Sequence, residues 1–338
     1  MWYRILIVVL ILPVEILGQN DRFFTLSNVR TRPLAMGGAF TSIEDDLAAI
    51  NFNPAAFELY QDEKSRRVTF FFNPIGPVVG ALENKNLYDG SGTTIDNLLL
   101  SLSLLLKSIS ISIHSLEVCV LLGEEGLNLP AALLDEKVFG VSGFRQNHFH
   151  SIVGRLKLGN KISLGGAANL LYGSTTNNPF ERHSELGISY GILLKPERGL
   201  NIGVSFVNLP DSLNQYRLPI ERIVDESVNI GVSYQLFSGT LFSIDVRNLG
   251  EEQQEVIREI HFGMEQVLLS QLAIRAGYYK KKTGEHVISW GMGILDGNRF
   301  FSDENKFNHR NFYINYSFVY ESSPVNTRWH FLSFNIRI

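Results

Sequence analysis

Two short runs of the sequence contain the residue types that hydrolytic enzymes use. One is His148–Ser151 (HFHS) and the other is His183–Glu185 (HSE). Neighbouring side chains of an extended strand point to opposite faces, so the second run cannot converge on one site. The first run is interpreted as a solvated loop. No His-Glu-x-x-His or Cys-x-x-Cys motif is present. The sequence therefore predicts no catalytic residue, no enzyme activity and no cofactor.

An acidic pair, Asp45 and Asp46, is the one place where a cation could be held. Capping, contact with solvent or pairing with arginines explains the pair better, and we predict no metal site. A second set of charged residues falls on the faces of strands that we expect to point inward. These residues are Arg155, Glu185, Asp245, Arg247, Glu265, Arg275 and Arg337.

Charge in a confined interior is costly unless it is paired. One interpretation is therefore that these residues form ion-pair networks that hold an N-terminal plug, partly through Asp45 and Asp46. The other is that they simply line a water-filled interior. The sequence leaves both open.

The segments that carry these charges alternate strictly between apolar and polar residues. From Phe149 onward they run for about 8–11 residues and end in Gly, Asn, Pro or charge. In 184–194, for example, Leu186, Ile188 and Tyr190 share one face, and the other face is small or polar. The apolar faces end in aromatic residues, as in interfacial girdles. We place six in these girdles: Tyr172, Tyr234, Trp290, Tyr316, Tyr320 and Trp329.

Such faces are typical of a wall between lipid and a polar lumen. Because lipid tolerates no unpaired backbone group, the sheet must close. The sequence predicts an all-β fold, a transmembrane antiparallel β-barrel with an N-terminal hatch inside the lumen. A soluble sandwich or propeller is the alternative, but nearly every segment has a full apolar face and no repeat motif is present.

The strand count depends on the region before Phe149. Arg67–Phe72 is expected to be a strand that bends at Pro74 and continues through Pro77–Leu82. Segment 96–106 is expected to be a short helix or an apolar loop, and a change of parity near His114–Ser115 suggests a bulge. Val138–Phe144 is expected to be another strand. This gives 14 strands, or 15 if the bent strand is split, and we take the even number that single-chain bacterial barrels favour.

The composition agrees with an exported barrel. The chain has 338 residues, a formal net charge of −4 and one cysteine, Cys119. These values exclude a disulfide framework and make nucleic acid an unsuitable partner. Arg4 followed by an apolar run to Gly18 predicts a secretory signal peptide. We expect residues 1–18 to be the signal, 19–66 the hatch and 67–338 the barrel, located in the bacterial outer membrane.

The hatch segment has a motif of its own. A small-residue turn contains Gly37 and Gly38, and an apolar run then ends in Asn53, Pro54 and Ala55. Proline removes a backbone donor and keeps the preceding residue out of the helical region, so the run ends in a fixed bend.

Segment 33–56, PLAMGGAFTSIEDDLAAINFNPAA, resembles the N-terminal region of FadL-like outer-membrane barrels, and most of all their PorV/PorQ branch. His261–Tyr279 is similar to a late hairpin of that family. Phe57 departs from the pattern, because Gly commonly follows Asn-Pro-Ala there. The resemblance implies a 14-stranded barrel with a hatch.

For function, the resemblance implies an accessory barrel of type IX secretion or surface assembly, which binds secretion components or cargo signal domains. The alternative is a FadL-like passive transporter of hydrophobic small molecules. Outer-membrane lipid is a partner in either case.

Overall fold

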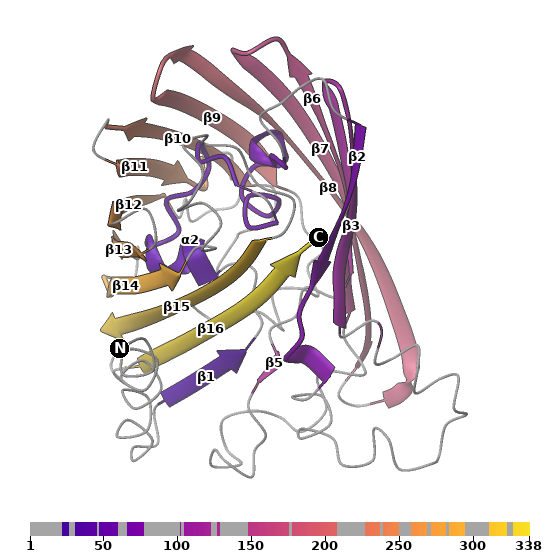
Figure 1. The fold of residues 1–338 in the computed structure, drawn as a ribbon. Coiled ribbons are helices and arrows are strands. Elements are labelled where there is room, and N and C mark those ends of the chain that lie inside the picture. Colours follow the sequence, from indigo (N-terminus) through magenta and orange to yellow (C-terminus); the bar gives the residue numbers. More distant parts are fainter. Residues whose placement is uncertain are drawn as a thin grey trace, which may run out of the picture.

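The computed structural model describes residues 22–26, 31–45, 47–59, 66–77, 102, 105–122, 127–128, 148–175, 178–207, 227–236, 239–249, 258–268, 272–281, 284–294, 311–322 and 327–338. Most of them belong to one sheet, which curves around a short N-terminal segment (Figure 1). Among these residues, no helix is long and apolar enough to cross a membrane.

Fourteen of the sixteen described strands form a closed antiparallel ring, because only β1 and β5 stand outside it. The ring strands are β2 (Arg66–Phe72), β3 (Leu106–Ile113), β4 (Leu116–Leu121), β6 (His148–Leu158), β7 (Ile162–Thr175), β8 (Asn178–Glu197), β9 (Leu200–Val207), β10 (Ser227–Gln235), β11 (Thr240–Arg247), β12 (Glu259–Leu268), β13 (Leu272–Lys280), β14 (His286–Ile294), β15 (Asn311–Ser322) and β16 (Thr327–Arg337). The predicted 14-stranded barrel is confirmed.

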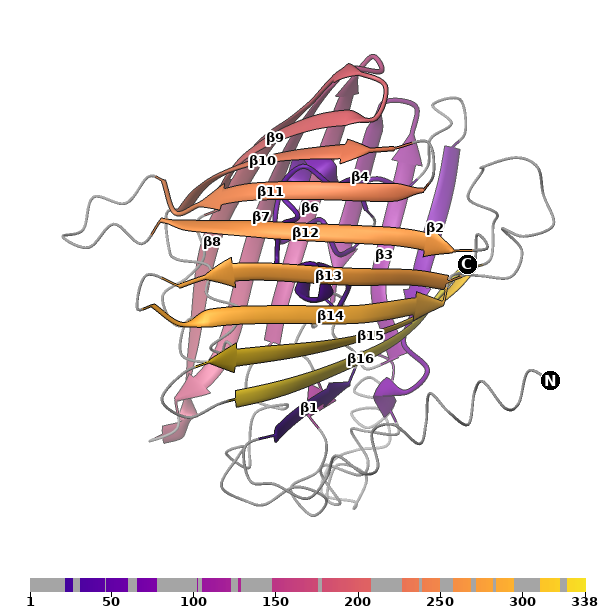
Figure 2. The ribbon, with the colours of Figure 1, turned by 90° about the vertical axis from the view of Figure 1, so that its left-hand side faces the viewer.

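The ring has two ends, which we name from β16. The distal end is where β16 begins at Thr327, and the proximal end is where it finishes at Arg337. Strands β10 to β14 run side by side between the two ends in Figure 2.

The two faces of the wall differ as the alternation predicts. On β8, Leu186, Ile188 and Tyr190 are exposed on the outside by 66%, 58% and 56%, whereas Ser189 between them is 3% exposed. The outer faces of the other ring strands are similarly apolar. A closed sheet with an apolar exterior meets both requirements for spanning a lipid bilayer: every backbone hydrogen-bonding group is paired, and the outer surface is apolar. The protein is thus a β-barrel of the outer-membrane type.

Two expectations about this wall are wrong. The parity change at His114–Ser115 is a two-residue turn between β3 and β4, not a bulge, and His114 has a left-handed φ of 51°. A tight turn shifts the parity just as a bulge does. Trp329 faces the lumen and is 3% exposed, because it shares its parity with buried Phe331 and not with the outward residues of β16.

The expected strands around this region are also revised. β2 ends at Phe72 and the chain turns at Asn73–Gly76. Beyond Pro77, the expected continuation to Leu82 lies outside the described residues, as do Val138–Phe144 and most of segment 96–106. β4 pairs directly with β6, so the count of fourteen is reached with β3 and β4 as separate strands.

The ring closes where β16 meets β2, which we call the junction. Eleven register pairs join β15 to β16, but only two, at Phe71 and Phe72, join β16 to β2, next to two backbone hydrogen bonds between Phe70 and Ile338. The same edge of β16 pairs farther toward the distal end with β1 (Arg22–Leu26), which runs parallel to it from Arg328 to Leu332. The two-residue strand β5 (Leu127–Asn128) lies on the other side of β1.

The hatch, residues 31–59, lies inside the ring (Figure 1). It contains α2 (Thr31–Ala35), which packs against β13 to β16, and the 3-10 turn η2 (Pro54–Ala56), which packs against β6 to β9. The Asn53 side-chain oxygen accepts the Ala55 N–H at 3.0 Å, which caps η2, and Pro54 occupies the first helical position, where no donor is needed.

Candidate functional site: the hatch seat

The hatch carries a small apolar core of its own. Phe40 and Phe52 pack with their ring centroids 5.6 Å apart, and small residues fill the space around them. The buried members of this core are Met36, Phe40, Ile43, Ala48, Ala49, Phe52, Ala55, Ala56 and Leu193 of the wall. The segment is therefore a compact plug.

Glycines on the inner wall give the hatch backbone its room. A Cβ at Gly277 would lie 1.9 Å from the Gly37 nitrogen, and a Cβ at Gly165 would lie 2.2 Å from the Ala55 nitrogen. Side chains cannot approach backbone this closely. Other inner glycines that leave room for the hatch are Gly191, Gly203, Gly231, Gly263 and Gly291.

The Gly37–Gly38 turn is held by polar groups of three strands. Both residues have positive φ, 62° and 73°, which glycine adopts without strain. The Gly37 N–H donates to the Ser289 hydroxyl at 2.9 Å, and its carbonyl oxygen lies 2.6 Å from Nδ1 of His261. The Arg247 guanidinium donates to the Gly38 carbonyl.

Asp245 holds the next part of the hatch. One of its carboxylate oxygens accepts the backbone N–H groups of Phe40 and Thr41, both at 2.8 Å. Two amides on one buried carboxylate make a charge-assisted anchor. Asn53 of the hatch makes a further contact with the wall. Its side-chain amide donates to the Thr41 carbonyl of the hatch at 2.9 Å and to the Ile192 carbonyl of β8 at 3.2 Å.

A first ion-pair network joins α2 to β12 and β13. Arg32 of the hatch binds Glu265 through two hydrogen bonds of 2.8 and 2.6 Å and donates to Asp45 at 2.7 Å. Arg275 donates to the same Glu265 carboxylate at 2.5 Å and to Asn315 at 2.8 Å. One wall carboxylate thus bridges a hatch guanidinium and a wall guanidinium.

A second network lies on the opposite side of the lumen and centres on Arg155 of β6. Its guanidinium donates to Glu44 at 2.5 Å, to Glu117 at 3.4 Å and to the Phe57 carbonyl at 2.7 Å. Nζ of Lys157 donates a hydrogen bond to the Glu58 carboxylate at 2.9 Å. This fully buried arginine therefore joins the hatch, at Glu44 and Phe57, to the wall, at Glu117 and Ser163.

The charged state of the hatch groups follows from these contacts. Burial alone would raise the pKa of Glu58, but the positive charges of Arg155, Lys157 and Lys195 outweigh it and hold its pKa below the ordinary range. Burial alone would lower the pKa of Arg32, but the carboxylates of Glu265 and Asp45 outweigh it and raise the pKa, so the guanidinium stays charged.

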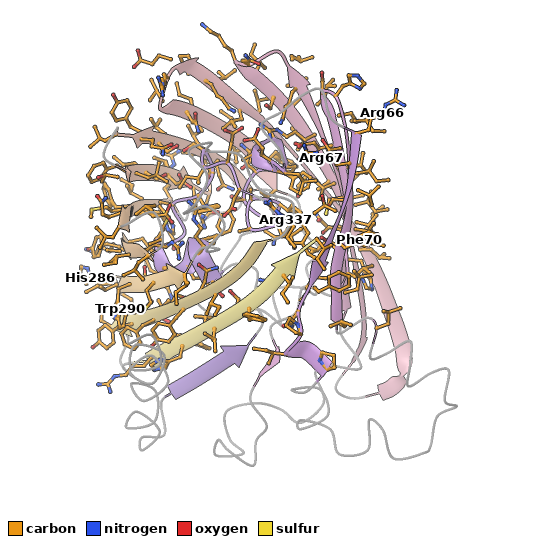
Figure 3. All side chains as sticks on the ribbon, viewed as in Figure 1. Arg66, Arg67, Phe70, His286, Trp290 and Arg337 are labelled. Atoms are coloured by element: carbon orange, nitrogen blue, oxygen red, sulfur yellow. The ribbon has the colours of Figure 1, made fainter. Side chains whose placement is uncertain are left out.

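The structure brings together most of the residues singled out in the sequence. Arg155, Asp245, Arg247, Glu265 and Arg275 all lie on the inner wall and contact the hatch or its partners. Arg337 is buried on the inside of β16, as Figure 3 shows. Asp46 and the side chain of Glu185 lie outside the described residues.

Asp45 pairs with Arg32 of the hatch, and the shared carboxylate of Glu265 links this pair to the wall arginine Arg275. Sequence reasoning also missed Arg32, Glu44, Glu58, Glu117, Lys157, Lys195, His261 and Ser289. Their signal is weak, because each partner is distant in the sequence.

We call the glycines and polar groups described above the hatch seat. Two apolar groups on the inner wall, which we call the junction clusters, belong to strands on either side of the junction. One joins hatch residues to Phe71, Cys119, Leu121, Val153 and Ala167. The other, the distal junction cluster, lies toward the distal end, where β16 pairs with β1, and joins Leu34 of α2 to Tyr279, Val287, Val319, Trp329 and Phe331. Between β2 and β4, the inner face of β3 is lined by serines.

The contacts of the hatch seat are hydrogen bonds, ion pairs and apolar packing. Among the described residues, no three His, Cys, Asp or Glu side chains come together as a metal site. The titratable groups around the hatch are engaged in ion pairs or in hydrogen bonds to backbone. What the arrangement can do is hold a plug in the lumen, or release it.

No family model and no curated protein matches the chain. Among solved structures, it is similar to the CymD monoaromatic hydrocarbon channel at 8% identity, covering 90% of this chain and 95% of that chain with a TM-score of 0.48. It is also similar to a FadL homologue of Pseudomonas aeruginosa at 11% identity, covering 92% of this chain and 96% of that chain with a TM-score of 0.43.

Such low values carry no functional argument, so the function has to follow from the contacts of this chain. The PorV/PorQ resemblance stays a prediction, because neither structure names that branch.

Proposed function

We propose that this barrel is a passive channel for hydrophobic small molecules in the bacterial outer membrane. The observation that carries the proposal is the placement of the two junction clusters. Buried apolar side chains line the inner wall of the strands on both sides of the ring contact with the fewest register pairs, and those on the β16 side lie farther along the strand, toward its pairing with β1.

The energetics favour an apolar solute on this side of the lumen. Apolar surface removed from water gains about 25 cal/mol per Å². A solute that reaches the junction clusters is therefore stabilised there and is separated from the hydrocarbon only by the wall. The β16–β2 contact is the place where the fewest backbone hydrogen bonds must break for it to leave sideways into the bilayer.

The hatch is the closure of such a channel. It lies across the lumen and touches both junction clusters through Leu34, Ile50 and Phe57. A solute displaces or follows the apolar side chains of the hatch, while the hatch seat keeps the plug from leaving. No chemical step is needed, since flux follows the concentration gradient.

A disulfide across the junction tests this proposal. Phe72 and Ile336 are register partners on β2 and β16. Paired strand residues lie close enough for a disulfide. In a Cys119→Ser background, Phe72→Cys with Ile336→Cys should take up an apolar fluorescent solute into proteoliposomes when reduced, and several-fold more slowly when oxidised.

The matched control is Ile244→Cys with Phe262→Cys, a register pair between β11 and β12 far from the junction. Oxidation of this pair should leave uptake unchanged. Equal uptake by the oxidised and reduced junction pair would overturn the lateral route.

The secretion-accessory function predicted from the sequence remains the second candidate. The hatch seat, which fills the lumen with a firmly held plug, suits a barrel that binds a partner without transporting anything. The secretion-accessory function is supported if the wild-type barrel shows no solute flux and co-purifies with a secreted protein.

A further inference from the structure

The outer face of β12 to β16 is graded from one end to the other. Toward the proximal end its residues are apolar without polar aromatic groups, such as Leu272, Ile294 and Ile338, with Phe334 beside them. Nearer the distal end come aromatic side chains, among them Tyr278, 37% exposed, and Trp290, 41% exposed. Figure 3 shows Trp290 pointing away from the barrel. The order is the one expected on passing from hydrocarbon into the interface.

Basic residues cap this gradient at the distal end of four strands. They are Arg258, Lys280, His286 and Arg328. The register places them in a band, because Lys280 faces His286 across β13 and β14, and Arg328 lies beside Tyr320 one row below. His286 also points outward in Figure 3.

The described acids at this end face other groups. Glu259 and Glu321 are buried on the inner side, and Glu285, just before β14, lies 4.0 Å from Nζ of Lys281. Lys280, Arg258 and Arg328 form no ion pair with any residue in the described ranges. His286 is oriented instead by a hydrogen bond of 2.7 Å between its Nδ1 and the Tyr278 hydroxyl, with the two rings stacked.

We propose that this distal basic band and the aromatic row beneath it bind the phosphate head group of an anionic lipid beside the barrel. The positive groups recognise the phosphate, and Tyr278 and Trp290 lie where the head group joins the chains. The apolar rows below accept the acyl chains. A free phosphate would use only the basic groups, so the continuity with the apolar wall points to a lipid.

The proximal end of the same strands provides the contrast. The exposed large side chains there are apolar, so the same five strands offer no comparable basic band in the described residues at that end. The site is therefore specific to one side of the membrane. It is independent of the proposed channel function, because none of its residues faces the lumen.

Native mass spectrometry of the full chain tests the proposal. The barrel is purified in a neutral detergent with equal amounts of phosphatidylglycerol and phosphatidylcholine, and the lipids that stay bound are counted. Wild type should retain the anionic lipid preferentially. The double variant Lys280→Gln with Arg328→Gln should lose that preference, by about fivefold for each basic group removed.

The matched control is Arg66→Gln with Lys161→Gln, which removes the same charge from exposed sites near the proximal end of β2 and in the β6–β7 turn. It should keep the wild-type preference. Heat-dependent gel mobility verifies that both variants fold. An equal loss in both variants, or no loss in either, overturns the proposal. So does full displacement of the bound lipid by millimolar inorganic phosphate, which would indicate an anion site without a role for the chains.

Discussion

The hatch seat and the junction clusters line the same lumen with opposite chemistry. The seat uses glycines that admit backbone to within van der Waals contact and charges that bind in pairs, as Gly277 and Glu265 show. The junction clusters use bulky apolar side chains such as Trp329 and Phe71. The seat depends on geometry and charge, whereas the clusters depend only on the exclusion of water.

This difference separates the contacts that retain the hatch from those that a passing solute can replace. Buried ion pairs are strongly coupled, and removing one partner leaves an uncompensated charge. Apolar contacts are non-directional and can be exchanged for contacts with another apolar molecule. A plug that is held by the first kind of contact and touched elsewhere by the second can stay in place while an apolar solute moves past it.

The largest effect is expected at Arg155. Arg155→Gln leaves the carboxylates of Glu44 and Glu117 without the guanidinium that they share, at a cost of about 3–5 kcal/mol. The hatch should become sensitive to protease while the barrel still migrates as a folded species on gels. Arg66→Gln, an exposed arginine of β2, is the control and should behave as wild type. A protected hatch in Arg155→Gln would show that the ion pairs do not hold it.

Two adjacent glycines of β7 give the next test. A Cβ at Gly165, on the inner face, would lie 2.2 Å from the Pro54 carbonyl carbon. A Cβ at Gly166, on the outer face, would have its nearest neighbour 4.0 Å away. Gly165→Ala should destabilise the seated hatch by about 1–3 kcal/mol, as overpacking does. Protease protection and thermal unfolding should change in Gly165→Ala and not in Gly166→Ala. The same response in both would mean that only strand propensity was measured.

Acid should loosen the seat before it affects the junction clusters, which contain no carboxylate. The folded-state pKa of Glu58 lies below its ordinary value of 4.5, so its contribution to stability is present above that value and is lost as the pH falls through the folded-state pKa. Hatch protection in wild type should therefore decline in acid. In Glu58→Gln it should be weaker at neutral pH and depend less on acid. Parallel pH curves would contradict this assignment.

The sequence predicted what depends on local pattern. Alternation sets the face of every strand, so the apolar exterior and the inward direction of Arg155, Asp245 and Arg275 followed from parity alone. Parity alone also predicts that Trp329 faces inward, because it shares a face with Phe331. Our prediction put aromatic character ahead of parity and was wrong at that residue. The turn at His114 was missed because a turn and a bulge change the parity in the same way.

The contacts within the site could not be predicted this way. Arg32 and Glu265 are 233 residues apart, and nothing local marks them as partners. The inner glycines were explained by crowding on a concave wall, but Gly277 and Gly165 are needed because the hatch backbone occupies the space of their side chains. Such a requirement depends on two distant segments at once, so one strand read alone does not reveal it.

The smallest expected effect separates the two surfaces most directly. Val319→Thr keeps the shape of a fully buried member of the distal junction cluster and adds a hydroxyl, at a cost of about 1 kcal/mol. Hatch protection should stay as in wild type, because Val319 makes no polar contact with the plug. Uptake of an apolar solute should fall several-fold, because the surface that attracts it has become polar. The control Val232→Thr changes an outward valine of β10 and should leave uptake unchanged. If Val319→Thr instead loosens the hatch and leaves uptake intact, the junction cluster is part of the seat and the division between the two surfaces fails.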